Sequence, residues 1–230
     1  MVTVHLAGGL GNQMFQYAAG RALQIRRNDR LQVEIMSLLR KGAFEADREY
    51  ALDIFAAAPE LTELSKSLIT RPGLINAPGF DRFLSHIDSK SRYIHERAFR
   101  YDPELFETSE HNISLTDYWQ SSKYFEAIGD VIREDFASRV PLSQRGAELA
   151  RHIISVNSVS LHVRRGDFIS GPVASNCHGF TEIDYYYRAI KLLNERRLPD
   201  TQLSRGQASE DHETRAYGLS QAAKHSRKSP

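Results

Sequence analysis

The start of the chain constrains its fold more than any other feature, because strand and helix patterns alternate there. Residues 2–7 (VTVHLA) and 31–36 (LQVEIM) are short, apolar and rich in β-branched side chains, which is typical of buried strands. The helix expected between them, at 13–27, takes Asn12 as its N-cap and places on one face Phe15, Ala18, Ala19, Ala22 and Ile25. This βαβ unit predicts an α/β fold with a parallel sheet.

Later segments continue these patterns without an internal repeat. We expect strands at 113–119 and 156–163, and helices at 124–138, 143–154 and 183–196. Residues 40–110 predict mixed helix and loop, with turn signals at Arg71-Pro-Gly and Ala77-Pro-Gly.

The last part of the chain differs from the rest in composition. Within residues 201–230 the only large aliphatic side chains are Leu203 and Leu219, and such a segment cannot offset chain entropy by burial. We expect it to be disordered, either as a solvated terminus or as a replacement of the original coding sequence. The whole chain is 41% hydrophobic and 26% charged, which is a globular composition.

Charge and cysteine content exclude several classes of protein. The chain has 30 basic and 29 acidic side chains and a net charge of +1, so nothing points to nucleic acid or an anionic membrane as a partner. The single cysteine, Cys177, forms no intrachain disulfide. The N-terminus lacks a signal-peptide pattern, and no apolar run approaches the ~20 residues of a membrane span. We therefore expect a cytoplasmic protein.

Glycines between the first strand and the first helix form the first candidate site, Gly8-Gly9-Leu10-Gly11-Asn12-Gln13. Backbone N–H groups there can approach an anion, and the helix N-terminus adds a positive dipole. As a dinucleotide fingerprint the run is poor, since Met14 stands where Gly or Ala is needed. The alternative is a tight turn that only closes the βα unit. The amides of Asn12 and Gln13 favour binding slightly, because they can bond a sugar or a phosphate.

A charged cluster at the end of the strand expected at 156–163 forms the second candidate site, His162-Val-Arg164-Arg165-Gly166-Asp167. Ligands bind outside the carboxyl ends of strands in open parallel sheets. Two adjacent arginines suit a diphosphate, since each guanidinium offers a rigid bidentate fork. The alternative is an Arg–Asp pair that closes a surface turn.

A third stretch and several absences also bear on the chemistry. Residues 117–125 (DYWQSSKYF) either line a sugar site or supply core residues, with Ser121 or Ser122 capping the next helix. The sequence has no Asp-x-Asp pair and no His/Glu set at metal-ligand spacing. A leaving diphosphate would then need arginine and backbone N–H groups instead of a metal ion. We expect structural roles for the histidines without obvious partners: His5, His86, His95 and His111.

Three motifs taken together resemble one enzyme family. They are GGLGNQMFQYA at 8–18, YWQSSKYF at 118–125 and HVRRGDF at 162–168, in this order. This combination resembles the α-1,2-fucosyltransferases (glycosyltransferase family 11), in a bacterial form without a membrane anchor. The resemblance covers residues 1–200.

The resemblance implies a specific reaction and fold. It implies transfer of fucose from GDP-fucose to the 2-hydroxyl of a galactose-containing glycan, with inversion and without a metal or other cofactor. A lipid-linked acceptor would bring the enzyme to the inner membrane surface. The implied fold is GT-B-like, with two Rossmann-type domains: an N-terminal acceptor-side domain at 1–154 and a GDP-fucose-binding domain that begins at 155.

The resemblance also implies the site residues. On the donor side they are His162, Arg164, Arg165 and Asp167, and across the cleft they are Gly9, Gly11, Asn12 and Gln13. Arg164 or Arg165 would stabilise the departing diphosphate, and we favour Arg164 because it shares a strand face with His162. Asp167 and His162 are the candidates for the general base that the acceptor hydroxyl needs.

The chain departs from the family pattern after about Gln202. Family members continue with an acidic Ser-Asp-Asp stretch and a tryptophan-rich segment, whereas Trp119 is the only tryptophan of this chain. Residues 156–199 have room for one strand and one helix. We therefore expect an incomplete donor domain at 155–200, impaired transfer, self-association, and a non-family tail at 201–230.

Other functions stay open on the sequence alone. A non-catalytic module that binds a sugar or a nucleotide would share the N-terminal site, and a fucosyltransferase of another linkage, such as α-1,6, would share the arginine motif. A pyridine-nucleotide oxidoreductase is disfavoured by Met14. It is also disfavoured because no acidic ribose partner ends the second strand, where Ser37 follows Met36.

Overall fold

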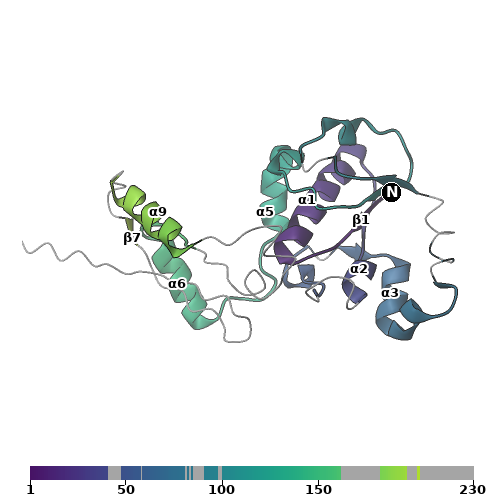
Figure 1. The fold of residues 1–230 in the computed structure, drawn as a ribbon, viewed down its shortest axis with the longest axis horizontal. Helices are drawn as coiled ribbons and strands as arrows, with labels where there is room; N and C mark the ends of the chain where they lie inside the picture. The colour runs from purple at the N-terminus through teal and green to yellow at the C-terminus, as the bar shows by residue number, and fades with distance from the viewer. Residues whose placement is uncertain are drawn as a thin grey trace, which may run out of the picture. The chain divides into compact units, whose positions relative to one another are not determined.

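The computed structural model describes most of the chain as an α/β protein. The described residues are 1–40, 48–57, 59–80, 82, 84, 91–97, 100–161, 182–195 and 201–202. They fall into two compact units, Met1–Pro141 and Leu142–Pro230 (Figure 1).

A parallel sheet organises the first unit. Within the described residues it has five strands in the order β3-β2-β1-β5-β4, and every neighbouring pair is parallel. The strands are β1 (Val2–His5), β2 (Leu31–Glu34), β3 (Glu60–Leu61), β4 (Arg92–Ile94) and β5 (Ile113–Leu115). The predicted α/β class and the parallel sheet are confirmed, although the strands expected at 2–7, 31–36 and 113–119 are shorter.

The middle region holds more than the expected mixture of helix and loop. Besides β3 and β4 it contains α3 (Glu63–Thr70) and three short 3-10 turns: η1 (Leu52–Ile54), η2 (Pro72–Asn76) and η3 (Pro103–Glu107). A further short helix, α2 (Met36–Leu39), follows β2 and takes up the end of the strand expected at 31–36.

Helix α1 (Leu10–Arg27) covers one face of β1 (Figure 1). Its N-cap is Gly9, so the prediction that Asn12 caps the helix is wrong: the turn leaves the strand earlier and Asn12 lies in the first helical turn. Ile25 is 38% exposed, contrary to the expected face. The buried side includes the polar residues Gln13 and Gln16, because this end of the helix faces loops whose backbone groups need partners.

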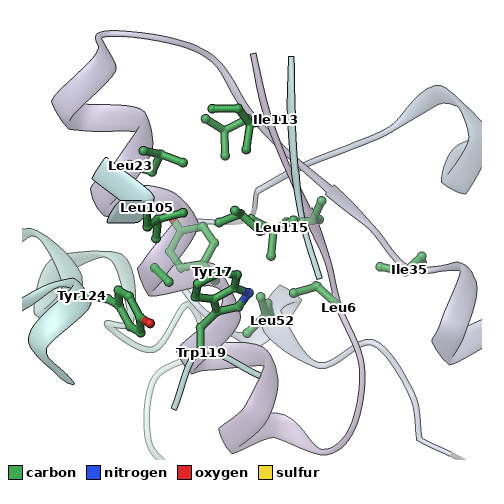
Figure 2. Close-up of a cluster of buried hydrophobic side chains, with 14 residues drawn as sticks. Leu6, Tyr17, Leu23, Ile35, Leu52, Leu105, Ile113, Leu115, Trp119 and Tyr124 are labelled. Atoms are coloured by element: carbon green, nitrogen blue, oxygen red, sulfur yellow. The ribbon is translucent and has the colours of Figure 1, made fainter. Parts of the chain in front are cut away.

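The core of the first unit lies between α1 and the sheet (Figure 2). It includes Leu6 just after β1, Leu115 of β5, the helix residues Tyr17 and Leu23, and the loop residue Trp119, and each is nearly inaccessible to water. Burying a large apolar side chain contributes about 1.5–3 kcal/mol. Two aromatic side chains of the 117–125 stretch, Trp119 and Tyr124, are therefore core residues, as one of the two sequence interpretations held.

The helix expected at 124–138 is broken. The structure has 3-10 turns η4 (Ser122–Tyr124) and η5 (Glu126–Ile128), followed by the helix α5 (Gly129–Asp135). Tyr124 anchors the start, since its buried hydroxyl accepts from Asp102 N at 2.9 Å and donates to Arg100 O at 3.1 Å. These contacts hold the chain in a tight turn and delay the regular helix.

The second unit contains the two helices that the sequence predicts there. Helix α6 (Gln144–Ile154) begins at Ser143, whose hydroxyl accepts from Gly146 N at 3.1 Å, and α9 spans Ile183–Glu195. Of the strand expected at 156–163, the structure has β6 (Asn157–Ser158), paired in parallel with β7 (Thr201–Gln202). Residues 159–161 are described and lie outside a strand.

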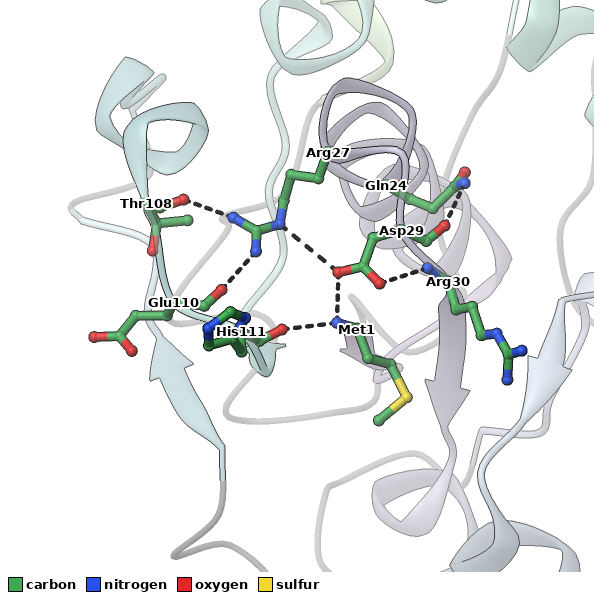
Figure 3. A network of polar contacts seen from close by, with 8 residues as sticks. All are labelled: Met1, Gln24, Arg27, Asp29, Arg30, Thr108, Glu110 and His111. Atoms are coloured by element: carbon green, nitrogen blue, oxygen red, sulfur yellow. Dashed lines mark hydrogen bonds and ion pairs between the residues drawn. The ribbon is translucent and has the colours of Figure 1, made fainter.

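The amino edge of the sheet is tied by a polar network (Figure 3). The Met1 ammonium group pairs with Asp29 and donates to His111 O at 2.7 Å. Arg27, in the last turn of α1, donates to the carbonyl groups of Thr108 at 2.6 Å and Glu110 at 2.5 Å. The network joins the end of α1 to β1 and to the loop before β5.

Asp29 makes part of this stability dependent on pH. Hydrogen bonding from the N-terminal ammonium group lowers the pKa of Asp29 below its ordinary value. The Asp29 contribution is therefore present above an ordinary aspartate pKa, ~3.9, and is lost as the pH falls through the lower pKa of the folded state. Because the pair is partly exposed, Asp29→Asn should cost about 0.5–1 kcal/mol at pH 7.

Urea unfolding at pH 7 and at pH 2 measures this effect. The difference in unfolding free energy between the wild type and Asp29→Asn should be present at pH 7 and shrink at pH 2. Glu107→Gln is the control, because Glu107 is 72% exposed in its pair with Arg26. A difference that is equal at both pH values would contradict this role for Asp29.

Candidate functional site

The carboxyl edge of the sheet carries the candidate site. The strand order reverses between β1 and β5: from β1 the chain runs outward through β2 to β3, and it then crosses to β4 at the opposite edge and returns to β5 beside β1. Ligands of open parallel sheets bind at such a switch point, outside the carboxyl ends of the strands. The loops that follow β1, β5 and β4 all begin at this edge, because the three strands are parallel.

The loop after β1 leaves the first turn of α1 open. Gly8 has a φ of 74°, which strains any residue with a side chain, and a Cβ there would also displace the Asn12 amide, whose Nδ2 would lie 2.3 Å away. A Cβ at Gly9 or Gly11 would meet nothing within 4 Å. The first turn contains no acidic residue, and the N-cap makes no side-chain bond. The exposed N–H groups of this turn can therefore bind an anion.

Two buried glutamines of α1 brace the loops around this edge. Gln13 Nε2 donates to Gly8 O at 2.9 Å and Glu49 O at 2.8 Å, and its Oε1 accepts from Ala51 N at 3.0 Å. Its side chain is fully buried. In this structure Gln13 acts as a brace, and its predicted contact with a donor stays a prediction.

Gln16 bridges the two loops on either side of the switch point. Its Oε1 accepts from Ala7 N at 3.0 Å, after β1, and its Nε2 donates to Asp117 O at 2.9 Å, after β5. The residue is fully buried. The sequence analysis missed this role. The signal that could have revealed it is the polar Gln16 on the core side of the helix, within the GGLGNQMFQYA run.

Gln16→Leu should lower the unfolding free energy by about 2 kcal/mol. The variant leaves the Ala7 N–H and the Asp117 carbonyl without their partner, and an unsatisfied buried group costs about 1–3 kcal/mol. Urea unfolding measures the loss. In the matched variant Gln120→Leu the amide removed is exposed, so its loss should stay below about 0.5 kcal/mol. Equal losses in the two variants would contradict the brace.

The loop after β5 is strained. Asp117 and Trp119 have φ angles of 72° and 53°; aspartate tolerates this left-handed region, but a bulky residue such as Trp119 avoids it. The Trp119 ring is anchored in the core and meets Tyr124 edge-on at 5.3 Å. Gln120 Nε2 donates to Asn12 Oδ1 at 2.7 Å and so joins this loop to the first turn of α1. Such strain persists where the surroundings enforce it, which is common at functional sites.

The loop after β4 completes the edge. Asp117 Oδ2 accepts from Glu96 N at 3.1 Å and lies 3.2 Å from His95 Nδ1. In return, Glu96 Oε2 accepts from Trp119 N at 2.9 Å. The loops after β4 and β5 are therefore joined by hydrogen bonds in both directions. Burial raises the pKa of the Glu96 carboxyl, against the backbone N–H groups around Trp119, and the Asp117 carboxylate adds to the increase.

His95 does have partners, so treating it as a histidine without them is wrong. Besides Asp117, its Nδ1 lies 2.9 Å from Thr116 Oγ1. The sequence could not show this, because β4 and β5 are separated along the chain and only their parallel pairing brings His95 beside Asp117.

Glu34 corrects a second expectation. The second strand ends at Glu34, so an acidic residue does stand where a ribose partner would be sought. It is 5% exposed, and its carboxylate accepts from Thr62 Oγ1, from Ser65 Oγ at 2.6 Å and from Met36 N at 3.0 Å. Glu34 is thus engaged in joining β2 to α3 and is not directed at a nucleotide.

The second candidate site lies outside the described residues. Its members are His162, Arg164, Arg165 and Asp167. The alternative in which Ser121 or Ser122 caps a helix finds no side-chain bond: Ser121 is the N-cap of η4, but its hydroxyl does not bond there.

Among the described residues, no group of three or more His, Cys, Asp or Glu could hold a metal ion, and no helix is long and apolar enough to cross a membrane.

Comparisons with known proteins place the chain more narrowly. The family model described as glycosyl transferase family 11 matches residues 1–200. An alpha-1,2-colitosyltransferase of Escherichia coli is 29% identical over 199 residues, which are 85% of this chain and 65% of that protein. The O-antigen biosynthesis glycosyltransferase WbnK of Escherichia coli is 29% identical over 209 residues, 83% of this chain and 67% of that protein. The chain thus spans about two thirds of the length of these relatives, and no solved structure matches it.

Proposed function

Since the chain belongs to glycosyl transferase family 11, we propose that it serves the transfer of fucose from GDP-fucose to the 2-hydroxyl of a galactose residue in a glycan, with inversion. The observation that carries the proposal is the family match over residues 1–200, which includes all three motifs. The relative named as an alpha-1,2-colitosyltransferase supports the 1,2 linkage.

The groups at the carboxyl edge of the sheet suit the binding of the sugar donor. The open first turn of α1 at Gly9 and Gly11 offers N–H groups, and Asn12 adds an amide beside them. We assign these groups to the donor's diphosphate or sugar, and we propose a GT-B-like architecture for the fold. His162, Arg164, Arg165 and Asp167 complete the proposed donor site, and no metal or cofactor is required.

A second donor sugar is favoured by one observation. A relative that covers 85% of this chain is named a colitosyltransferase. We therefore keep α-1,2 transfer of colitose as the second candidate function. The two candidates share the proposed acceptor hydroxyl and arginine motif and differ in the sugar that the donor carries.

Calorimetry tests the class of function. GDP-fucose and GDP should bind saturably but weakly, in line with the impairment expected of this chain. NAD should not bind, because Glu34 is engaged by Thr62 and Ser65. Gly8→Ala, which places a Cβ against Asn12 and reshapes the loop, should weaken GDP binding. Binding of NAD without binding of GDP-fucose would overturn the proposal. Binding of GDP-fucose with no transfer would favour a non-catalytic binding module instead.

A further inference from the structure

An exposed imidazole stands at the carboxyl end of β4, beside the strained loop after β5. The His95 side chain is 69% exposed, and the Asp117 side chain is 44% exposed. Only one nitrogen of the ring, Nδ1, faces the protein groups described above: Asp117 Oδ2 at 3.2 Å and Thr116 Oγ1 at 2.9 Å.

The partners of Nδ1 determine which nitrogen carries the proton. The Asp117 carboxylate can only accept. The Thr116 hydroxyl donates its proton to Ile94 O at 3.3 Å, so its oxygen is also left as an acceptor. Nδ1 therefore carries the hydrogen, and the lone pair of Nε2 is directed away from these partners. A base oriented by a carboxylate on its far nitrogen is the arrangement used in general base catalysis.

The acidic group next to His95 in the chain, Glu96, is less suited to take a proton. Glu96 Oε2 is bonded to Trp119 N at 2.9 Å, and its Oε1 is buried without a hydrogen-bond partner among the described residues. Its carboxylate holds the loop, whereas the His95 ring reaches solvent. The backbone of Asp117 is itself held by Gln16, so the carboxylate that orients the imidazole has a fixed position.

We propose that His95 is the general base that activates the acceptor hydroxyl, and that Asp117 is its positioning residue. The inference rests on the proposed transfer of a sugar from a nucleoside diphosphate. In the step, the acceptor O–H bond breaks and its proton passes to His95 Nε2. The acceptor oxygen forms a bond to the anomeric carbon, and the bond from that carbon to the phosphate oxygen breaks, with its electron pair leaving on the nucleoside diphosphate.

Transfer by three variants tests the inference, with radiolabelled GDP-fucose and long incubations so that slow transfer is measured. His95→Gln should lower kcat by about 10²-fold or more and leave the KM for GDP-fucose unchanged. Asp117→Asn should lower kcat by less. His111→Gln is the matched control, because His111 is an exposed histidine just before β5, at the opposite edge of the sheet. The kcat of this variant should match that of the wild type.

Two readouts separate catalysis from a structural role. Added imidazole should restore part of the activity of His95→Ala, since the ring it replaces is exposed. Nitrogen NMR of the wild type should show the hydrogen of the His95 ring on Nδ1. Wild-type transfer by His95→Gln, or a hydrogen on Nε2, would overturn the inference and leave the proposed function intact. An inactive wild type would overturn both.

Discussion

Arg164→Ala is expected to lower sugar transfer by about 10²–10³-fold, which is the effect of removing one donor that stabilises developing charge. Departure of the nucleoside diphosphate places negative charge on its phosphate. A guanidinium aimed there stabilises the transition state more than the bound substrate, so kcat should fall more than KM rises. Initial rates over a range of GDP-fucose concentrations separate the two.

Two further variants sharpen this test. Arg164→Lys keeps the charge but loses the bidentate fork, so its kcat should lie between the wild type and Arg164→Ala. Arg151→Ala is the control, because Arg151 is an exposed arginine of α6 whose Nε donates to Ala147 O at 3.4 Å, within its own helix. Full activity of Arg164→Ala, with the loss found in Arg165→Ala instead, would reassign the role to the neighbouring arginine.

Gly20→Val should lower the unfolding free energy by about 3 kcal/mol. Helix α1 approaches β1 so closely at this point that a Cβ on Gly20 would lie 2.2 Å from Val4 Cγ2 and 3.2 Å from Leu31 Cδ1. Val4 is fully buried in the central strand, so it cannot move aside without disturbing both neighbouring strands. Urea unfolding, followed by circular dichroism, measures the loss.

A double-mutant cycle identifies the contact responsible. Val4→Ala removes the methyl groups that a Cβ on Gly20 would meet, so Gly20→Ala and Val4→Ala together should cost less than the sum of the single variants. Gly11→Ala is the control in the same helix, because nothing lies within 4 Å of its added Cβ, and its stability should be unchanged or raised by up to about 1 kcal/mol. Additive losses in the cycle would show that the close approach is not the cause.

The sequence predicts the fold best where patterns are long and local. The βαβ unit at the start and the helices at 143–154 and 183–196 follow from periodicity, and the structure has all of them. Strands β3 and β4 escape prediction because they are short and each includes a charged residue, whereas β5, also of three residues, begins the largely apolar stretch 113–119. A strand so short carries no period of its own and exists because its neighbours pair with it.

The candidate site, too, can be predicted only where a feature depends on residues that are close in the sequence. The glycines of the first loop can be recognised directly, because they follow a strand pattern and precede a helix pattern. The roles of His95 and Glu96 cannot, because they depend on Asp117 and Trp119, which reach them only through the pairing of β4 with β5. The prediction that Asn12 caps α1 is wrong because Gly9, which has no side chain to bond, caps the helix and places Asn12 in its first turn.

The most direct test of the account is the linkage of the product. The protein is incubated with GDP-fucose and a β-galactoside, and the disaccharide is analysed by proton NMR. The account predicts an α-linked fucose on the galactose 2-hydroxyl, formed together with GDP. A fucose on any other hydroxyl, or bound GDP-fucose that is never transferred, would contradict it.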